Sequence, residues 1–245
     1  MKERLEVKAL FVSDIHLGSR YSKAEQFLTF LRSIQPETLY LVGDFIDGWK
    51  LKKRFYWNDT HSFIIRRIIG MMKNGTKVKY IAGNHDEFLR EFMPNGNLGH
   101  LEILDEDIYH TIDGRKLLII HGDIFDQITR QAKWLYYLGD NAYSLAMWIN
   151  DLYNTVRRKM GLPYWSLSKK LKQNVKEAVN FINSFEYYIV KHTKECGCSG
   201  VICGHIHYPT IKKIENIDYY NCGDWVESCT AIVEHLDGNF ELLDF

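Results

Sequence analysis

The sequence has no excess of charge of either sign and no long hydrophobic stretch. Thirty-one Lys and Arg residues balance thirty-one Asp and Glu residues among the 245, so the formal net charge at pH 7 is zero. A nucleic-acid-binding domain usually carries a basic surface, so we expect no nucleic-acid partner. No stretch approaches the roughly 18 uncharged apolar residues of a membrane-spanning helix, and the first ten residues lack the apolar core of an export signal. We therefore expect a cytoplasmic protein without a transmembrane helix.

Cysteine is also scarce, and the five cysteines do not fit a disulfide framework. Their number is odd and the chain is not a small secreted domain. Cys196, Cys198 and Cys203 are near enough in sequence to suggest a zinc cluster. However, Cys-x-Cys is not the usual Cys-x2-Cys spacing, and Cys203 lies in an apolar run typical of a strand. We therefore predict reduced thiols throughout.

What the sequence does contain is an alternation of strand and helix patterns, in a composition typical of a globular domain (46% hydrophobic, 25% charged). The N-terminal part alternates three strands with two helices, which predicts a parallel sheet with right-handed crossovers. Ser22 is the expected N-cap of the first helix, Asn74-Gly75 closes the second, and the segment between Asp44 and Thr60 reads as a polar and aromatic loop. The expected elements are strands 7–13, 39–42 and 77–82 and helices 22–34 and 60–73.

The rest of the chain changes character twice. A short helix at 87–92 precedes a hairpin of two strands, 108–112 and 116–120, around Asp113-Gly114. From about 127 to 192 the pattern is helical and rich in aromatics, which we interpret as a cap inserted into one domain spanning 1–245. Its aromatic stretch, Trp134 to Tyr153, suits a membrane interface, an acyl-chain groove, or packing against the core or a second subunit. Strands resume at 200–203 and continue to the C-terminus.

Residues that can bind a metal ion follow five of the predicted strands, each at the point where the strand ends. Because the carboxyl ends of parallel strands meet at one edge of a sheet, we expect these side chains to converge. Gly83 is expected to permit an unusual backbone angle before Asn84. Carboxylate, imidazole and amide donors suit Mn, Fe or Zn, and seven ligands are enough for two ions that share a carboxylate. The seven are Asp14, His16, Asp44, Asn84, His121, His205 and His207.

Five motifs, in this order along the chain, resemble those of the calcineurin-like metallophosphoesterases: DxH (14–16), GDxxD (43–47), GNHD (83–86), HGD (121–123) and GHxH (204–207). The resemblance implies a four-layer α/β/β/α sandwich and metal-dependent hydrolysis of a phosphoester at a dinuclear site. It also implies manganese as the metal, with iron or zinc as alternatives. One ion would be held by Asp14, His16, Asp44 and His207, and the other by Asp44, Asn84, His121 and His205, with Asp44 bridging.

His85 lies beside a metal ligand and is expected to have a catalytic role instead. It can face the phosphate, where it would stabilise the transition state or protonate the leaving oxygen. Asp47 resembles the family carboxylate that orients this histidine. The alternative is that Asp47 only caps a loop.

Within the family, the chain resembles the UDP-2,3-diacylglucosamine diphosphatases most. The resemblance rests on the stretches around these motifs, on the helical insertion and on 219–228 (YYNCGDWVES). The resemblance implies cleavage of the pyrophosphate of a lipid-linked sugar nucleotide, a precursor of lipid A, with release of UMP, by a cytoplasmic protein peripheral to the inner membrane. That group carries arginine at the position of His85; arginine clamps phosphate with a permanent charge and cannot donate a proton. Alternatives are a phosphatase or phosphodiesterase with another nucleotide- or lipid-linked substrate, and a non-catalytic scaffold. No feature of the sequence indicates the oligomeric state.

Overall fold

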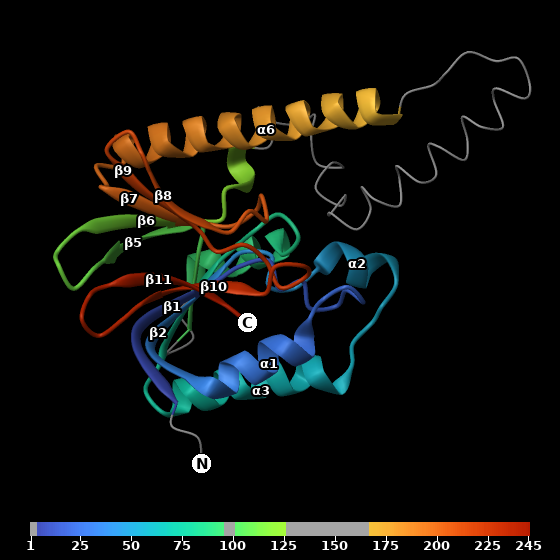
Figure 1. The fold of residues 1–245 in the computed structure, drawn as a ribbon. Coiled ribbons are helices and arrows are strands. Elements are labelled where there is room, and N and C mark those ends of the chain that lie inside the picture. Colours follow the sequence, from blue (N-terminus) through green and yellow to red (C-terminus); the bar gives the residue numbers. More distant parts are fainter. Residues whose placement is uncertain (1–3, 96–100, 126–166) are drawn as a thin grey trace, which may run out of the picture. The chain divides into compact units, whose positions relative to one another are not determined.

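The computed structural model describes residues 4–95, 101–125 and 167–245. The chain divides into two compact units, of which the first comprises Met1–Asp123 with Ile189–Phe245 and the second comprises Ile124–Tyr188. Both β-sheets lie in the first unit (Figure 1). All five cysteines are free thiols, as predicted.

The first sheet has six strands in the order β11-β10-β1-β2-β3-β4. Strands β1 to β4 run parallel, β10 pairs antiparallel with β1, and the edge strand β11 pairs antiparallel with β10. The parallel part confirms the topology predicted from the strand and helix order. The strands are β1 (Leu5–Val12), β2 (Ile34–Val42), β3 (Lys77–Ile81), β4 (Leu101–Leu104), β10 (Thr230–Glu234) and β11 (Phe240–Asp244).

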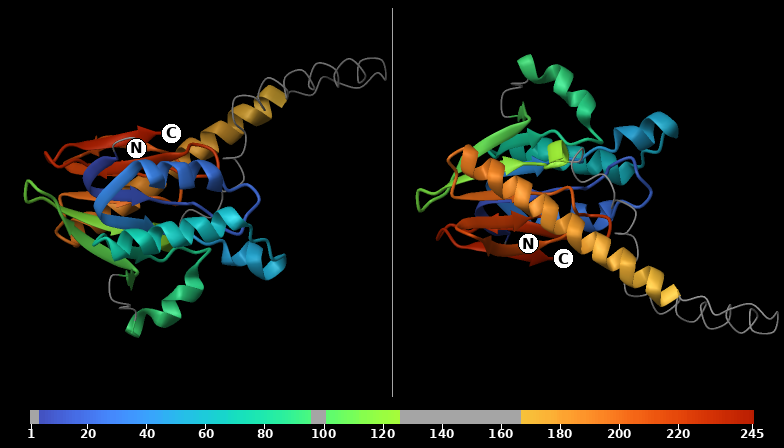
Figure 2. Two further views of the ribbon diagram at one scale, coloured as in Figure 1. Left: turned by 90° about the horizontal axis from the view of Figure 1, so that it is seen from below. Right: turned by 90° about the horizontal axis from the view of Figure 1, so that it is seen from above.

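Helices α1 (Ala24–Ser33) and α3 (Asp59–Lys73) lie side by side against one face of this sheet (Figure 2). Asn74 is the C-cap of α3 and Gly75 follows at φ 97°, as expected. Two predictions were wrong. Lys23 is the N-cap residue of α1, because the Ser22 hydroxyl donates instead to the Ile15 carbonyl at 2.7 Å. The expected loop also contains a short helix, α2 (Gly48–Lys53).

The second sheet has five strands in the order β5-β6-β7-β9-β8. It includes the predicted hairpin, and its inner face packs on the first sheet through an apolar core in which Phe11 stacks on Tyr40 at 5.0 Å and Tyr109 meets both rings edge-on. The strands are β5 (Glu106–His110), β6 (Lys116–Ile120), β7 (Gly200–Cys203), β8 (Thr210–Ile214) and β9 (Ile217–Asn221).

Helix α6 (Leu167–Glu195) runs into β7, and from Ile189 onward it belongs to the first unit. There it is joined to β5, where His192 Nε2 lies 3.0 Å from Glu106 Oε2. This helix end gives the unit the predicted α/β/β/α order. The expected short helix after β3 is a 3-10 helix, η1 (Glu87–Asn95), and another, η2 (Asp123–Phe125), follows β6.

The predicted cap at 127–192 lies largely outside the described residues, as does its whole aromatic stretch. The cap as a separate insertion stays a prediction. Across the described ranges, no helix is both long enough and apolar enough to cross a bilayer.

Candidate metal centre

The seven predicted ligands come from five loops, and these loops belong to two sheets rather than to one sheet edge as expected. Asp14, Asp44 and Asn84 follow β1, β2 and β3, whereas His121 and His205 follow β6 and β7. Stacking of the two sheets brings their loops together. The backbone joins them directly: the His205 N–H donates to Asp14 Oδ2 at 2.9 Å.

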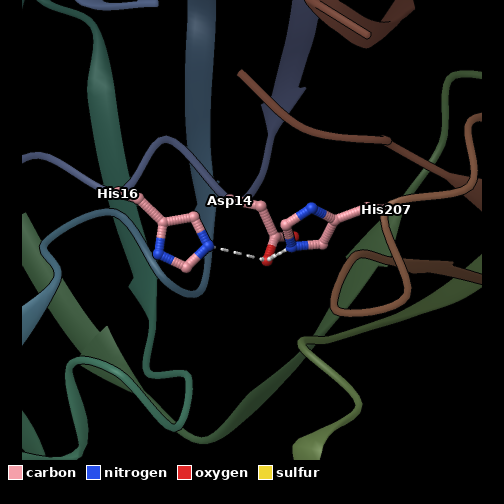
Figure 3. A group of neighbouring side chains, drawn as sticks. All are labelled: Asp14, His16 and His207. Carbon is pink, nitrogen blue, oxygen red and sulfur yellow. Dashed lines mark ion pairs between the residues drawn. The ribbon is translucent and has the colours of Figure 1, made fainter. Parts of the chain in front are cut away.

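One group of donors surrounds the Asp14 carboxylate. His207 Nε2 lies 3.0 Å and His16 Nε2 lies 3.6 Å from Asp14 Oδ1, so two rings from different sheets point at one oxygen (Figure 3). Asp14 is fully buried and His16 is 7% exposed. A buried carboxylate between two imidazoles is a donor set suited to a divalent transition-metal ion.

A second group surrounds Asp44. His121 Nε2 lies 3.5 Å and His16 Nε2 lies 3.9 Å from Asp44 Oδ2, so Asp44 faces donors of both groups. His205 Nδ1 lies 3.3 Å from His121 Nε2. His121 Nδ1 lies 2.9 Å from the Val42 carbonyl, and this contact fixes the ring with Nε2 toward the centre.

The electrostatics of this cluster favour a bound cation. Burial alone would lower the pKa of His16, but the carboxylates of Asp14, Asp47 and Asp44 outweigh it and raise that pKa to about 10. Burial would raise the pKa of Asp44, but His121 and His16 hold it below its usual range. In the described part of the chain no donor reaches the buried Oδ1 of Asn84. The Asn84 oxygen therefore lacks a partner, and the carboxylates raise the pKa of the neighbouring histidine. A divalent ion bound here would satisfy both the oxygen and the negative charge.

The backbone at the ligands is strained. Among described residues other than glycine, seven have a positive φ, and five of them are predicted ligands. Left-handed backbone costs a non-glycine residue on the order of 1–3 kcal/mol and is concentrated at functional sites. The five are Asp14 (φ 55°), His16 (51°), Asp44 (52°), His205 (69°) and His207 (51°).

Three of the motifs place a glycine directly before a predicted ligand, and each of these glycines packs closely against another predicted ligand. A Cβ on Gly43 would lie 2.7 Å from His121 Cβ, and one on Gly204 would lie 2.6 Å from Asp14 Oδ2. A Cβ on Gly83 would lie 2.7 Å from the Asp44 backbone nitrogen. Gly83 is not among the residues with positive φ, so its expected role in backbone angle was wrong. Glycine is required at position 83 because the Asp44 backbone approaches too closely to leave room for a Cβ.

His85 and Asp47 form a pair beside the two groups. His85 Nδ1 lies 3.0 Å from Asp47 Oδ1, and its Nε2 lies 3.9 Å from Asp44 Oδ2. Asp47 Oδ1 also accepts from the Lys50 N–H at 2.9 Å at the start of α2, so both expected contacts of Asp47 exist. The outer face of the His85 ring is covered by Trp49, with the ring centroids 4.2 Å apart.

Sequence reasoning gave no role to Asp86, the last residue of GNHD. Its buried carboxylate accepts from the Phe45 N–H at 2.9 Å, the Gly83 N–H at 2.6 Å and the Tyr80 hydroxyl at 2.5 Å. It therefore joins the loops after β2 and β3. Its position in GNHD, two residues after the predicted ligand Asn84, is the sequence signal that could have indicated this role.

Asp224 lies in the 219–228 stretch (YYNCGDWVES), but sequence reasoning gave it no role of its own. Its Oδ2 lies 3.7 Å from His207 Nδ1 and accepts from the Ser228 hydroxyl at 2.9 Å. The next residue, Trp225, donates its N–H to the Asp14 carbonyl at 3.1 Å. This turn therefore supports two predicted ligands from behind.

Residues 7–209 match the calcineurin-like phosphoesterases, and the chain belongs to this family of metal-dependent phosphohydrolases. The UDP-2,3-diacylglucosamine hydrolase of Haemophilus ducreyi is 26% identical over 244 residues, 95% of this chain and 98% of the relative. That of Vibrio atlanticus is 24% identical over 242 residues, 93% of each. Among solved structures, an archaeal phosphodiesterase aligns with a TM-score of 0.43 and 14% identity over 97% of this chain and 99% of its own. The family and the group predicted from the motifs are thereby confirmed.

Proposed function

We propose that this chain hydrolyses the pyrophosphate bond of UDP-2,3-diacylglucosamine, or of a closely related acylated sugar nucleotide, and releases UMP. The observation that carries the proposal is the meeting of donors from five loops around Asp14 and Asp44. The near full-length similarity to UDP-2,3-diacylglucosamine hydrolases supports the choice of substrate.

The residues would hold two divalent ions, with manganese as the proposed metal. One ion would be held by Asp14, His16, Asp44 and His207, and the other by Asp44, Asn84, His121 and His205. Bound ions would supply neutralisation of phosphate charge and a water of lowered pKa. The orphaned Asn84 oxygen and the raised pKa of His16 both support a cation at this place.

His85 would act on the leaving oxygen. The Asp47 carboxylate accepts from Nδ1–H and fixes the ring, which leaves Nε2 toward the centre to donate a proton. Because Arg cannot do this, a chain with histidine here gains proton donation and loses the bidentate clamp. Trp49 limits how far the ring can turn.

A substrate panel tests the proposal. The manganese-loaded protein would be assayed on UDP-2,3-diacylglucosamine, UDP-N-acetylglucosamine, a CDP-linked lipid and simple phosphomonoesters, each with and without detergent. We expect strong preference for the diacylated nucleotide and loss of all activity in Asp44→Ala. Indifference to the acyl chains would refute the substrate and favour another phosphoester. Manganese binding without cleavage of any ester would support a scaffold instead.

The role of His85 has its own test. His85→Ala should slow esters with poor leaving groups far more than activated aryl esters, because only the former need a proton on the leaving oxygen; general acid catalysis contributes roughly 10²–10⁴-fold. His85→Arg is the matched comparison, since it keeps positive charge without a transferable proton. Equal slowing of both ester classes in His85→Ala would leave only an electrostatic role.

We further propose a cytoplasmic protein that meets the inner membrane through its lipid-linked substrate. Sedimentation with phospholipid vesicles tests this, and vesicles that carry the diacylated nucleotide should retain more protein than plain ones. Equal recovery from both would contradict substrate-dependent contact.

A further inference from the structure

A second cluster of metal-binding side chains lies away from the centre, where α6 ends beside β5. Glu106 comes from β5, the edge strand of the second sheet, and His192 and Cys196 come from the last turn of α6 and its C-cap. All three residues belong to the first unit. Their donor atoms lie within 4.8 Å of one another.

The distances fit a tetrahedral ion. His192 Nε2 lies 3.0 Å from Glu106 Oε2 and 3.7 Å from Cys196 Sγ. In a tetrahedral zinc site with Zn–N and Zn–O of about 2.0 Å and Zn–S of about 2.3 Å, these separations would be about 3.3 Å and about 3.5 Å. Only small side-chain movements separate the cluster from a zinc site.

The backbone holds Cys196 where the site needs it. Gly197, at φ 66°, ends α6: its N–H donates to the Lys194 carbonyl at 3.0 Å and the Cys198 N–H donates to the Thr193 carbonyl at 3.1 Å. This pair of bonds is the Schellman arrangement, which fixes the chain through the helix end. Cys196 and His192 are four residues apart and therefore share one face of the helix.

We propose that Glu106, His192 and Cys196 bind one Zn²⁺ ion, with the fourth position open to water. Thiolate, imidazole and carboxylate are the donors that zinc takes in proteins, and the two anionic ligands neutralise its charge. Burial and the charges of Glu106 and Glu195 raise the pKa of the Cys196 thiol, so zinc binding must release that proton to solvent. The bound ion would join the edge strand to the helix end and close the loop of residues 107–191, which contains the whole second unit.

Cobalt gives the test, because a Co²⁺–thiolate bond has a charge-transfer absorption that the cysteine-free ligand set of the main centre cannot produce. The full-length metal-free protein would be titrated with Co²⁺ and then with Zn²⁺. We expect a thiolate band whose final intensity corresponds to one cysteine-bound Co²⁺ ion per chain. The band should disappear when zinc is added. Cys196→Ser should abolish the band, and His192→Ala and Glu106→Gln should weaken Co²⁺ binding by at least about 10-fold.

Two variants serve as controls. Cys229→Ser alters a cysteine elsewhere in the fold, and Glu195→Gln removes a neighbouring charge that is not a ligand; both should keep the band. Zn²⁺ can also replace manganese at the main centre, so the thermal test compares variants: Zn²⁺ should raise the unfolding midpoint of the wild type more than that of Cys196→Ser. Absence of the band in the wild type, or its persistence in Cys196→Ser, would overturn the proposal and leave His192 and Glu106 as an ordinary ion pair.

Discussion

Replacement of Gly83 by alanine should damage the centre although it replaces no predicted ligand. The new Cβ would lie 2.7 Å from the Asp44 backbone nitrogen and 2.9 Å from His121 Cδ2. Non-bonded carbon contacts relax at about 3.5 Å, so these groups must separate by about 0.6–0.8 Å. Displacement of about 1 Å in a catalytic geometry can cost about 10²-fold, and we therefore expect kcat/KM to fall by roughly 10–100-fold.

The same clash should lower stability. Overpacking of a close-packed region costs about 1–3 kcal/mol, and about 1 kcal/mol moves the midpoint of a chain of this size by about 2–4 °C. Gly83→Ala should therefore unfold about 2–12 °C below the wild type in a thermal scan. Manganese-dependent turnover of the same samples would be measured in parallel.

Gly70→Ala is the matched control. Gly70 lies in α3, and a Cβ there meets nothing within 4 Å. Alanine in a helix interior should stabilise by up to about 1 kcal/mol and leave turnover unchanged. Wild-type turnover together with a wild-type midpoint in Gly83→Ala would refute the close-approach argument.

Two further predictions concern protons and the loop contacts. Since the pKa of His16 is raised to about 10, this ring is protonated at pH 7 without metal, and the Asp14 carboxylate raises the pKa of His207 as well. Manganese binding should therefore release protons and weaken as pH falls. Calorimetry in buffers of different ionisation enthalpy measures this release, and a buffer-independent heat would contradict it. Asp86→Asn replaces an acceptor oxygen with an NH₂ donor beside the Phe45 and Gly83 N–H groups, so a hydrogen bond is lost. The free energy of unfolding in urea should fall by at least about 2 kcal/mol. An unchanged free energy of unfolding would mean that water replaces those contacts.

The clustering of the seven predicted ligands could be anticipated from sequence because each follows an apolar run, and a strand end is a local pattern. Their distribution over two sheets could not, since β3 and β6 differ in sheet but not in local character. Asp86 and Asp224 were missed because the Phe45 N–H and the His207 ring are distant in sequence and meet these carboxylates only in the folded chain. Helix α2 was missed because its six residues have no apolar periodicity. Its start depends on the Asp47 side chain, which caps the helix by accepting from the Lys50 N–H. The prediction for Ser22 was wrong because its hydroxyl donates to the Ile15 carbonyl, which lies outside the helix.

The left-handed backbone at five of the predicted ligands has a consequence for anyone who engineers this protein. At about 1–3 kcal/mol each, the conformations would together oppose folding by an amount comparable with the whole stability of a typical domain. Glycine adopts that conformation more readily than histidine or aspartate. A selection for heat resistance alone would therefore favour glycine at such positions, as in His207→Gly, and the most durable descendants of this chain would be those that had lost predicted metal ligands.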